Sequence, residues 1–253
     1  MNTADLLLIR RGVTKLIFRP EAPLMGFGMS LFFLIVYNAG IGGVGFLDAF
    51  GPNGYFAFIF PIALVSLAMG SSAGASQTLN ADMQSGYFRR MYLSPASRKV
   101  LIAAPMLADI LSTLIFSALI IMIGALFALP FRFGVLSILG VLLLSMLWAI
   151  TLCGFSTGVM IRTGRHQSAA IITNTVFPLI FLSTTYMPRE LITSEWLLTA
   201  SWGNPVTYVL EGMRFLLAGT SSGYFFTIAV AVLGITSLIS VTFAIRSAHN
   251  IKF

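Results

Sequence analysis

Long apolar runs of about 20 residues or more recur between residues 23 and 245 of this chain, and shorter polar segments separate them. A helix of about 20 such residues crosses the hydrocarbon of a bilayer and satisfies its own backbone polar groups. Only 9% of the 253 residues are charged, whereas a soluble domain carries roughly 25%. The sequence therefore predicts an all-α integral membrane protein, with residues 1–253 forming one membrane domain.

Six transmembrane helices are expected. Their approximate bounds are 23–45, 54–79, 100–129, 134–161, 168–186 and 224–245. Small residues recur every four positions in the second and fourth of these runs, a spacing typical of close helix packing: Ser66, Gly70 and Gly74, then Gly154 and Gly158. Such faces serve either packing within the chain or contact with a second copy.

Two other segments are amphipathic. Residues 3–19 place apolar side chains on one helical face and four cations on the rest, which predicts an interfacial helix; a cytoplasmic extension of the first span is the alternative. Residues 187–223 are too broken to cross a bilayer and are expected to form two short re-entrant helices on the outer face. Asn204 followed by Pro205 is typical of a helix N-terminus, and Gly219 of a helix end.

The cations predict the orientation. Four lie before the first span, four in residues 80–99, two in residues 162–166 and two in the C-terminal tail, against three in the intervening connections. The positive-inside rule then places both termini in the cytoplasm of a multi-pass protein of the cell (plasma or inner) membrane. Because the net charge of +7 is distributed in this way, it indicates a lipid bilayer and not nucleic acid as the partner.

Residues 80–99, NADMQSGYFRRMYLSPASRK, form the longest polar interruption. Phe88, Met91 and Tyr92 have helical spacing, and Gly86 and Pro95 bound them. This pattern predicts a short helix near 86–94 whose apolar side chains enter a groove on a soluble partner. A solvated loop is the alternative, but such a loop does not require three large apolar residues.

The sequence does not predict an enzyme. It contains no GxxxxGK[ST] phosphate loop, no HExxH motif and one cysteine, Cys153, so neither a nucleotide, a metal site nor a disulfide is expected within this chain. Among ionisable residues in apolar surroundings, Asp109 is either part of a gate or substrate path, or paired with a cation such as Arg162 or an N-terminal arginine. Glu211 and Arg214 are three residues apart and form either a local ion pair or part of a substrate exit.

Two blocks of sequence resemble the daunorubicin-resistance branch of the ABC type-2 exporter permeases. The first has the pattern D-x3-G-x-F-x-R-x4-P-x-S-R-x10-D over residues 82–109, and the second comprises PLIFLSTTYMP (178–188), Trp196 and NPVTYVLEGMR (204–214). The chain departs from that branch at Arg89, where an acidic residue is common, and at Ala104-Pro105, where a glycine-basic pair is expected.

The resemblance implies that residues 80–99 hold a coupling helix that contacts a cytoplasmic ATPase. With the helical spacing and the ionisable residues described above, it predicts ATPase coupling by Asp82, Gly86, Tyr87, Phe88, Arg89, Arg90, Met91, Tyr92, Pro95 and Arg98, and a gate or substrate path at Asp109, Asn204, Pro205, Glu211 and Arg214. It further implies an assembly of two permeases, identical or paralogous, with two ATPase copies that bind ATP and Mg²⁺.

The expected function is export of an amphipathic drug-like or lipid-like molecule by the permease subunit of an ATP-driven exporter. One alternative keeps the fold and exports a lipid-linked polysaccharide. An ATP-independent carrier or assembly scaffold is the alternative from another class; a carrier should place ionisable residues deep in several spans.

Overall fold

The computed structural model describes residues 7–8, 10–12, 14, 21–44, 50, 54–93 and 97–249. Within these ranges, the side chains of residues 21–23, 44, 89, 92, 98, 166, 169, 173, 248 and 249 are not described. The described part of the chain is built from helices, turns and bends without a β-strand, which confirms the predicted all-α class.

Five helices in the described ranges are long and apolar enough to cross a membrane. They are α2 (Glu21–Ile41), α3 continued by α4 (Gly54–Ser71 and Gly74–Gln84), α6 (Arg98–Leu126), α7 (Val135–Thr163) and α11 (Gly223–His249). The shorter elements are η1 (Gly42–Val44), α5 (Tyr87–Tyr92), η3 (His166–Ala169), α8 (Ala170–Phe181), η4 (Arg189–Leu191), α9 (Glu195–Gly203) and α10 (Pro205–Leu217).

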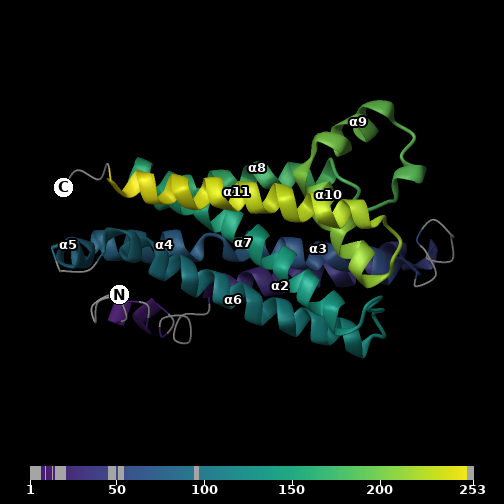
Figure 1. The fold of residues 1–253 in the computed structure, drawn as a ribbon, viewed down its shortest axis with the longest axis horizontal. Coiled ribbons are helices and arrows are strands. Elements are labelled where there is room, and N and C mark those ends of the chain that lie inside the picture. The colour runs from purple at the N-terminus through teal and green to yellow at the C-terminus, as the bar shows by residue number, and fades with distance from the viewer. Residues whose placement is uncertain are drawn as a thin grey trace.

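Figure 1 shows the long helices side by side in one elongated bundle. α3 forms its centre, because nearly every side chain from Tyr55 to Ser71 is buried and the helix contacts α2, α6, α7, α8 and α10. The outer helices expose large apolar side chains to their surroundings, including Met25, Phe32 and Ile35 on α2, Leu136 and Leu139 on α7, and Leu238 and Ile239 on α11. Exposed apolar area of this extent is expected where lipid replaces water.

The small-residue faces pack within the chain. A Cβ added to Gly70 would lie 2.3 Å from the Cα of Gly26, so α2 and α3 touch through their backbones. A Cβ on Gly154 would lie 2.5 Å from the Ser240 hydroxyl oxygen, and one on Gly158 would lie 2.3 Å from the Phe243 ring, both on α11. Of the two alternatives for these glycines, the structure supports internal packing.

The predicted second span, 54–79, is confirmed, and it extends further, to Gln84. The chain turns at Ser72 and Ala73 and resumes as α4, which continues to Gln84. Serine hydroxyls occupy carbonyl acceptors at this break: Ser72 Oγ, for example, donates to the Met69 carbonyl at 2.9 Å. The polar segment that follows is therefore shorter than residues 80–99.

The predicted fifth span, 168–186, is wrong in extent. α8 has 12 residues, about 18 Å of helix, against a hydrocarbon thickness of about 30 Å. Its last turn is closed by a side chain distant in sequence, because Asn204 Nδ2 donates to the Leu179 carbonyl at 2.5 Å. Taken together, η3, α8 and the turn up to Thr185 still run from one end of the bundle, where η3 contacts α4, to the other end, where Thr184 bonds to Glu211 of α10.

The region 187–223 forms short helices at one end of the bundle, as predicted, with α9 projecting beyond it (Figure 1). Asn204 caps α10 by accepting the Val206 N–H at 3.0 Å, with Pro205 in the first turn, and Gly219 follows the helix with a φ of +69°. These local predictions are confirmed.

The N-terminal prediction, an interfacial helix over 3–19, lies mostly outside the described residues. Its described residues are helical, and Gly12 packs so closely on α6 that an added Cβ would lie 2.9 Å from the Ala104 carbonyl oxygen. Ala104, one of the departures from the family pattern, is thus a contact of this segment.

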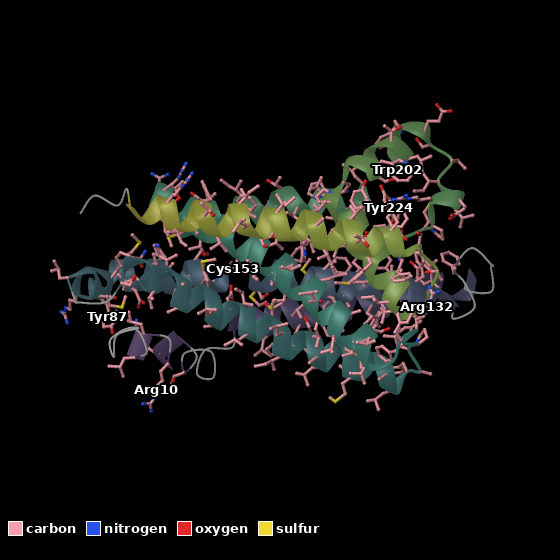
Figure 2. The ribbon with its side chains drawn as sticks, viewed as in Figure 1. Arg10, Tyr87, Arg132, Cys153, Trp202 and Tyr224 are labelled. Atoms are coloured by element: carbon pink, nitrogen blue, oxygen red, sulfur yellow. The ribbon has the colours of Figure 1, made fainter. Side chains whose placement is uncertain are left out.

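The charges separate between the two ends of the bundle. Arg10 and Tyr87 lie at the α5 end, and Arg132, Trp202 and Tyr224 lie at the α10 end (Figure 2). Arg10 and Arg132, which the charge count assigns to opposite sides of the membrane, thus lie at opposite ends of the bundle.

Candidate functional site

The end of the bundle at α5 is shaped by a glycine turn. Gly86 has a φ of +69°, in the left-handed region that side chains disfavour, and its N–H donates to the Met83 carbonyl at 3.2 Å. The chain thereby reverses from α4 into α5, which confirms the predicted short helix and its start. Pro95, its predicted end, lies outside the described residues.

Phe88 and Met91 are buried in this chain. Their exposed fractions are 2% and 7%, and they belong to a cluster with residues of α4, α6 and α7: Ala75, Leu79, Leu101, Ile102 and Met160. The prediction that these two side chains enter a partner's groove is therefore wrong; they attach α5 to its own bundle. The spacing of apolar residues could not distinguish the two cases, since both require one apolar face.

The outward side of α5 and the turn that follows it carry Tyr87, Arg90 and Leu93, and we call these three residues the α5 surface. Tyr87 is 36% exposed, Leu93 is 77% exposed and Arg90 is exposed. Leu93 was not among the predicted site residues, although a large apolar residue just after a polar helix is a signal that could have identified it. The side chains of Arg89, Tyr92 and Arg98 lie outside the described part of the structure.

Asp82 faces the N-terminal segment. Its carboxylate oxygens accept bonds from the Arg11 guanidinium at 2.8 and 3.0 Å, and Asp82 is only 6% exposed. The same guanidinium lies 4.0 Å from the centre of the Tyr87 ring. The assignment of Asp82 to a partner contact is thus corrected to an internal ion pair, and the role of Arg11, 71 residues away, was missed.

Asp109 lies at the break between α3 and α4. It is 7% exposed, and its Oδ2 accepts the N–H of Ala75, in the first turn of α4, at 3.2 Å. A Cβ on Gly74 would lie 2.4 Å from Oδ1, so a glycine is required beside this carboxylate. This bond gives the buried side chain a polar partner in an apolar span.

The proposed ion-pair partners of Asp109 are engaged elsewhere. Arg162 donates from Nε to the Ser247 hydroxyl at 3.1 Å. Of the N-terminal arginines with described side chains, Arg11 pairs with Asp82 and Arg10 is exposed. For these residues the ion-pair alternative is wrong, and the gate or substrate-path role of Asp109 stays a prediction.

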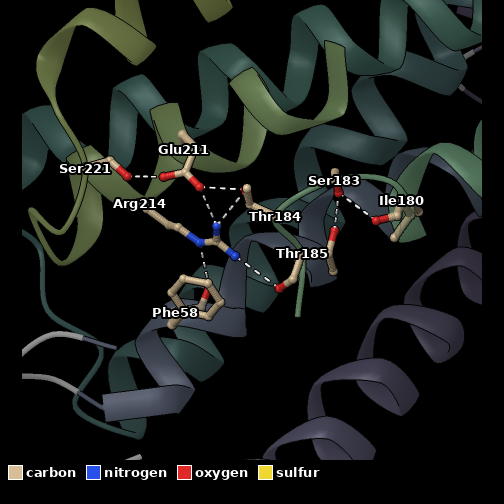
Figure 3. A network of polar contacts seen from close by, with 8 residues as sticks. All are labelled: Phe58, Ile180, Ser183, Thr184, Thr185, Glu211, Arg214 and Ser221. Atoms are coloured by element: carbon tan, nitrogen blue, oxygen red, sulfur yellow. Dashed lines mark hydrogen bonds and ion pairs between the residues drawn. The ribbon is translucent and has the colours of Figure 1, made fainter. Parts of the chain in front are cut away.

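At the opposite end, Glu211 and Arg214 form the predicted ion pair at 2.8 Å, but inside the protein (Figure 3). Arg214 is 1% exposed and also donates to the carbonyls of Phe58 and Thr185, at 3.0 and 3.1 Å. The Thr184 hydroxyl donates to Glu211 at 2.6 Å, and the Ser221 hydroxyl bonds to its other oxygen.

The charge of Glu211 is stabilised by this network. Burial alone would raise the pKa of Glu211, but the Arg214 charge and the bonds from Ser221 and Thr184 lower it below its ordinary value. The ion pair thus joins α10, α3 and the turn after α8 into one unit. The sequence could not reveal this, because the partner on α3 is a backbone carbonyl, that of Phe58.

The described residues form no cluster of metal ligands. Within those ranges, no three histidine, cysteine, aspartate or glutamate side chains come together as metal ligands. The α5 surface offers an exposed cation between two large side chains, which suits contact with another protein.

Comparisons with known proteins agree with this membrane architecture. The sequence profile of the ABC-2 type transporter family matches residues 4–218. The ycf38 protein of Cyanophora paradoxa, named as a transport permease, is 28% identical over 220 residues, covering 85% of this chain and 74% of that protein. The daunorubicin resistance ABC transporter permease protein DrrB1 of Streptomyces coeruleorubidus is 23% identical over 195 residues, covering 76% of this chain and 67% of that protein. The chain belongs to the ABC-2 type transporter family and is a multi-pass membrane permease of an ABC exporter.

Proposed function

We propose that this chain is the permease subunit of an ATP-driven exporter and that a cytoplasmic ABC ATPase binds the α5 surface. ATP and its Mg²⁺ bind to that partner, since this sequence has no phosphate loop. Two permease copies, identical or paralogous, assemble with two ATPases, and both termini lie in the cytoplasm of the cell membrane.

One observation carries this proposal: α5 is exposed on one side and firmly packed on the other. Phe88 and Met91 fix it to α4 and α6, in a cluster that extends to α7, while Tyr87, Arg90 and Leu93 face outward. A force applied to the α5 surface would therefore act on α6 and on α4, the continuation of α3, together. Such a rigid connection is what transmission of a partner's movement to a membrane cavity requires.

The proposed substrate is an amphipathic, drug-like or lipid-like molecule. The name of the relative from Streptomyces, daunorubicin resistance, supports this class. The apolar character of the helix surfaces also favours a substrate that enters from the lipid.

The ATPase contact is tested by purifying the tagged chain from its native cells and measuring the ATP hydrolysis that co-purifies. Replacing Tyr87→Ala, Arg90→Glu and Leu93→Asp together should reduce the associated hydrolysis at least fivefold, as about 1–2 kcal/mol per interface side chain implies. Arg165→Glu is the matched control, because it changes an exposed cation at the same end of the bundle without touching α5. Undiminished hydrolysis in the triple variant would refute the proposed contact.

The substrate class is tested separately in inverted membrane vesicles, with ATP-dependent uptake of daunorubicin and of a short-chain fluorescent phospholipid. Uptake of either compound by the wild type, and its loss in the triple variant, are expected. If ATP hydrolysis co-purifies normally and neither compound moves, the substrate class is wrong while the coupling surface stands.

A further inference from the structure

An open groove lies on the surface of α11 and α7, at the end of the bundle that carries α5. Its volume is about 420 Å³, and its lining consists of Leu238, Ile239, Thr242, Phe243, Arg246 and Arg162. Leu238 and Ile239 are 70% and 53% exposed, so the groove opens toward the surroundings of the bundle. It is separate from the α5 surface and from the Glu211–Arg214 network.

The wall of the groove changes from apolar to cationic along the helix. Leu238, Thr242 and Arg246 are successively four residues apart, so they share one face of α11 over about 12 Å. The Thr242 hydroxyl donates to the Leu238 carbonyl at 2.7 Å and is therefore satisfied within its own helix. An apolar chain can lie along this face without leaving a polar group unpaired.

The two arginines stand at the end of the groove. Arg162 is held in place, because Nε donates to the Ser247 hydroxyl at 3.1 Å and the guanidinium lies 4.5 Å from the centre of the Phe243 ring. Its Nη1 and Nη2 groups donate no hydrogen bond to the described part of the chain, and Arg246 is exposed. The ion pairs in those ranges, Arg11–Asp82 and Arg214–Glu211, lie elsewhere.

We infer that this groove binds an anionic phospholipid of the surrounding bilayer. The phosphate would accept hydrogen bonds from Arg162 and Arg246, and an acyl chain would pack along Leu238 and Ile239. A second copy of this chain fits less well, since a symmetric contact would bring four arginines together without a counter-ion. A zwitterionic lipid would bring its own cation to the same place. This inference is independent of the proposed ATPase contact.

The test uses the full chain in vesicles of phosphatidylcholine containing a small fraction of brominated lipid. Ile239→Trp places a reporter in the groove, and the parent chain without it supplies the background from the native tryptophans. Quenching by brominated phosphatidylglycerol should exceed quenching by brominated phosphatidylcholine at equal mole fraction. Each arginine near a lipid surface contributes roughly fivefold (about 1 kcal/mol) to such enrichment.

Arg162→Gln with Arg246→Gln should abolish the difference between the two lipids, whereas Arg165→Gln should preserve it. Arg165 is a matched control, because it is an exposed cation at the same end that does not line the groove. Equal quenching by both lipids in the reporter chain would overturn the inference. So would an equal loss in the control, which would indicate a general surface potential.

Discussion

Neutralising Glu211 should destabilise the protein strongly, because Arg214 would then be a buried cation without a counter-ion. Glu211→Gln preserves the size of the side chain and removes its charge. Arg214 is 1% exposed and its guanidinium lies 3.5 Å from the centre of the Phe58 ring, so water cannot replace the carboxylate. Breaking one partner of a buried pair costs about 3–5 kcal/mol.

The assay is thermal unfolding in detergent, followed by size-exclusion chromatography of the soluble fraction. For a chain of this length, 1 kcal/mol corresponds to about 2–4 °C, so Glu211→Gln should melt roughly 6–20 °C below wild type. Glu190→Gln is the matched control: Glu190 is an exposed carboxylate at the same end, and its loss should change the melting temperature by less than about 2 °C. A Glu211→Gln protein that melts as the control does would refute this account of the network.

The pH dependence follows from the lowered pKa of Glu211. A carboxyl group whose pKa falls on folding contributes stability that is complete above its ordinary pKa, about 4.3, and is lost as pH falls through the lowered value. The difference in melting temperature between wild type and Glu211→Gln should therefore be as large at pH 5.5 as at pH 7. A difference that halves by pH 5.5 would mean that folding raises this pKa.

Three further substitutions probe the other contacts. Gly70→Val, whose Cβ would lie 2.3 Å from the α2 backbone, should lower the yield of monodisperse protein severalfold, whereas Gly28→Val, which meets nothing within 4 Å, should not. Asp82→Asn should lower the melting temperature by about 2–4 °C, since Arg11 is partly exposed and the ion pair contributes about 1 kcal/mol. If adding Arg11→Gln doubles this decrease in melting temperature, the two residues act independently and the ion pair is refuted as the cause. Asp109→Asn should leave the amount of co-purified ATPase unchanged and reduce ATP-dependent uptake severalfold; unchanged uptake would leave the carboxylate with a structural role alone.

Much of the fold followed from the sequence, because a bilayer leaves an apolar chain few choices. Helices at the first, third, fourth and sixth predicted positions lie within a few residues of their expected bounds, since a lipid-exposed backbone must bond to itself. The start of α10 was equally predictable: the cap at Asn204 uses atoms two residues apart, and such local geometry does not depend on the rest of the molecule.

Only the tertiary structure decided which partner each side chain meets. Apolar spacing marked one face of α5 correctly, but the packing of α4, α6 and α7 turned Phe88 and Met91 inward and left Tyr87, Arg90 and Leu93 outside. Hydropathy predicts that the helix of α8 continues beyond Phe181, but it ends there. The side chain of Asn204, which is distant in sequence, donates to the Leu179 carbonyl oxygen near this end. Contacts of this kind depend on surfaces that exist only after the helices have packed. Sequence patterns therefore locate the membrane spans, but they do not determine which side chains remain free to contact a partner.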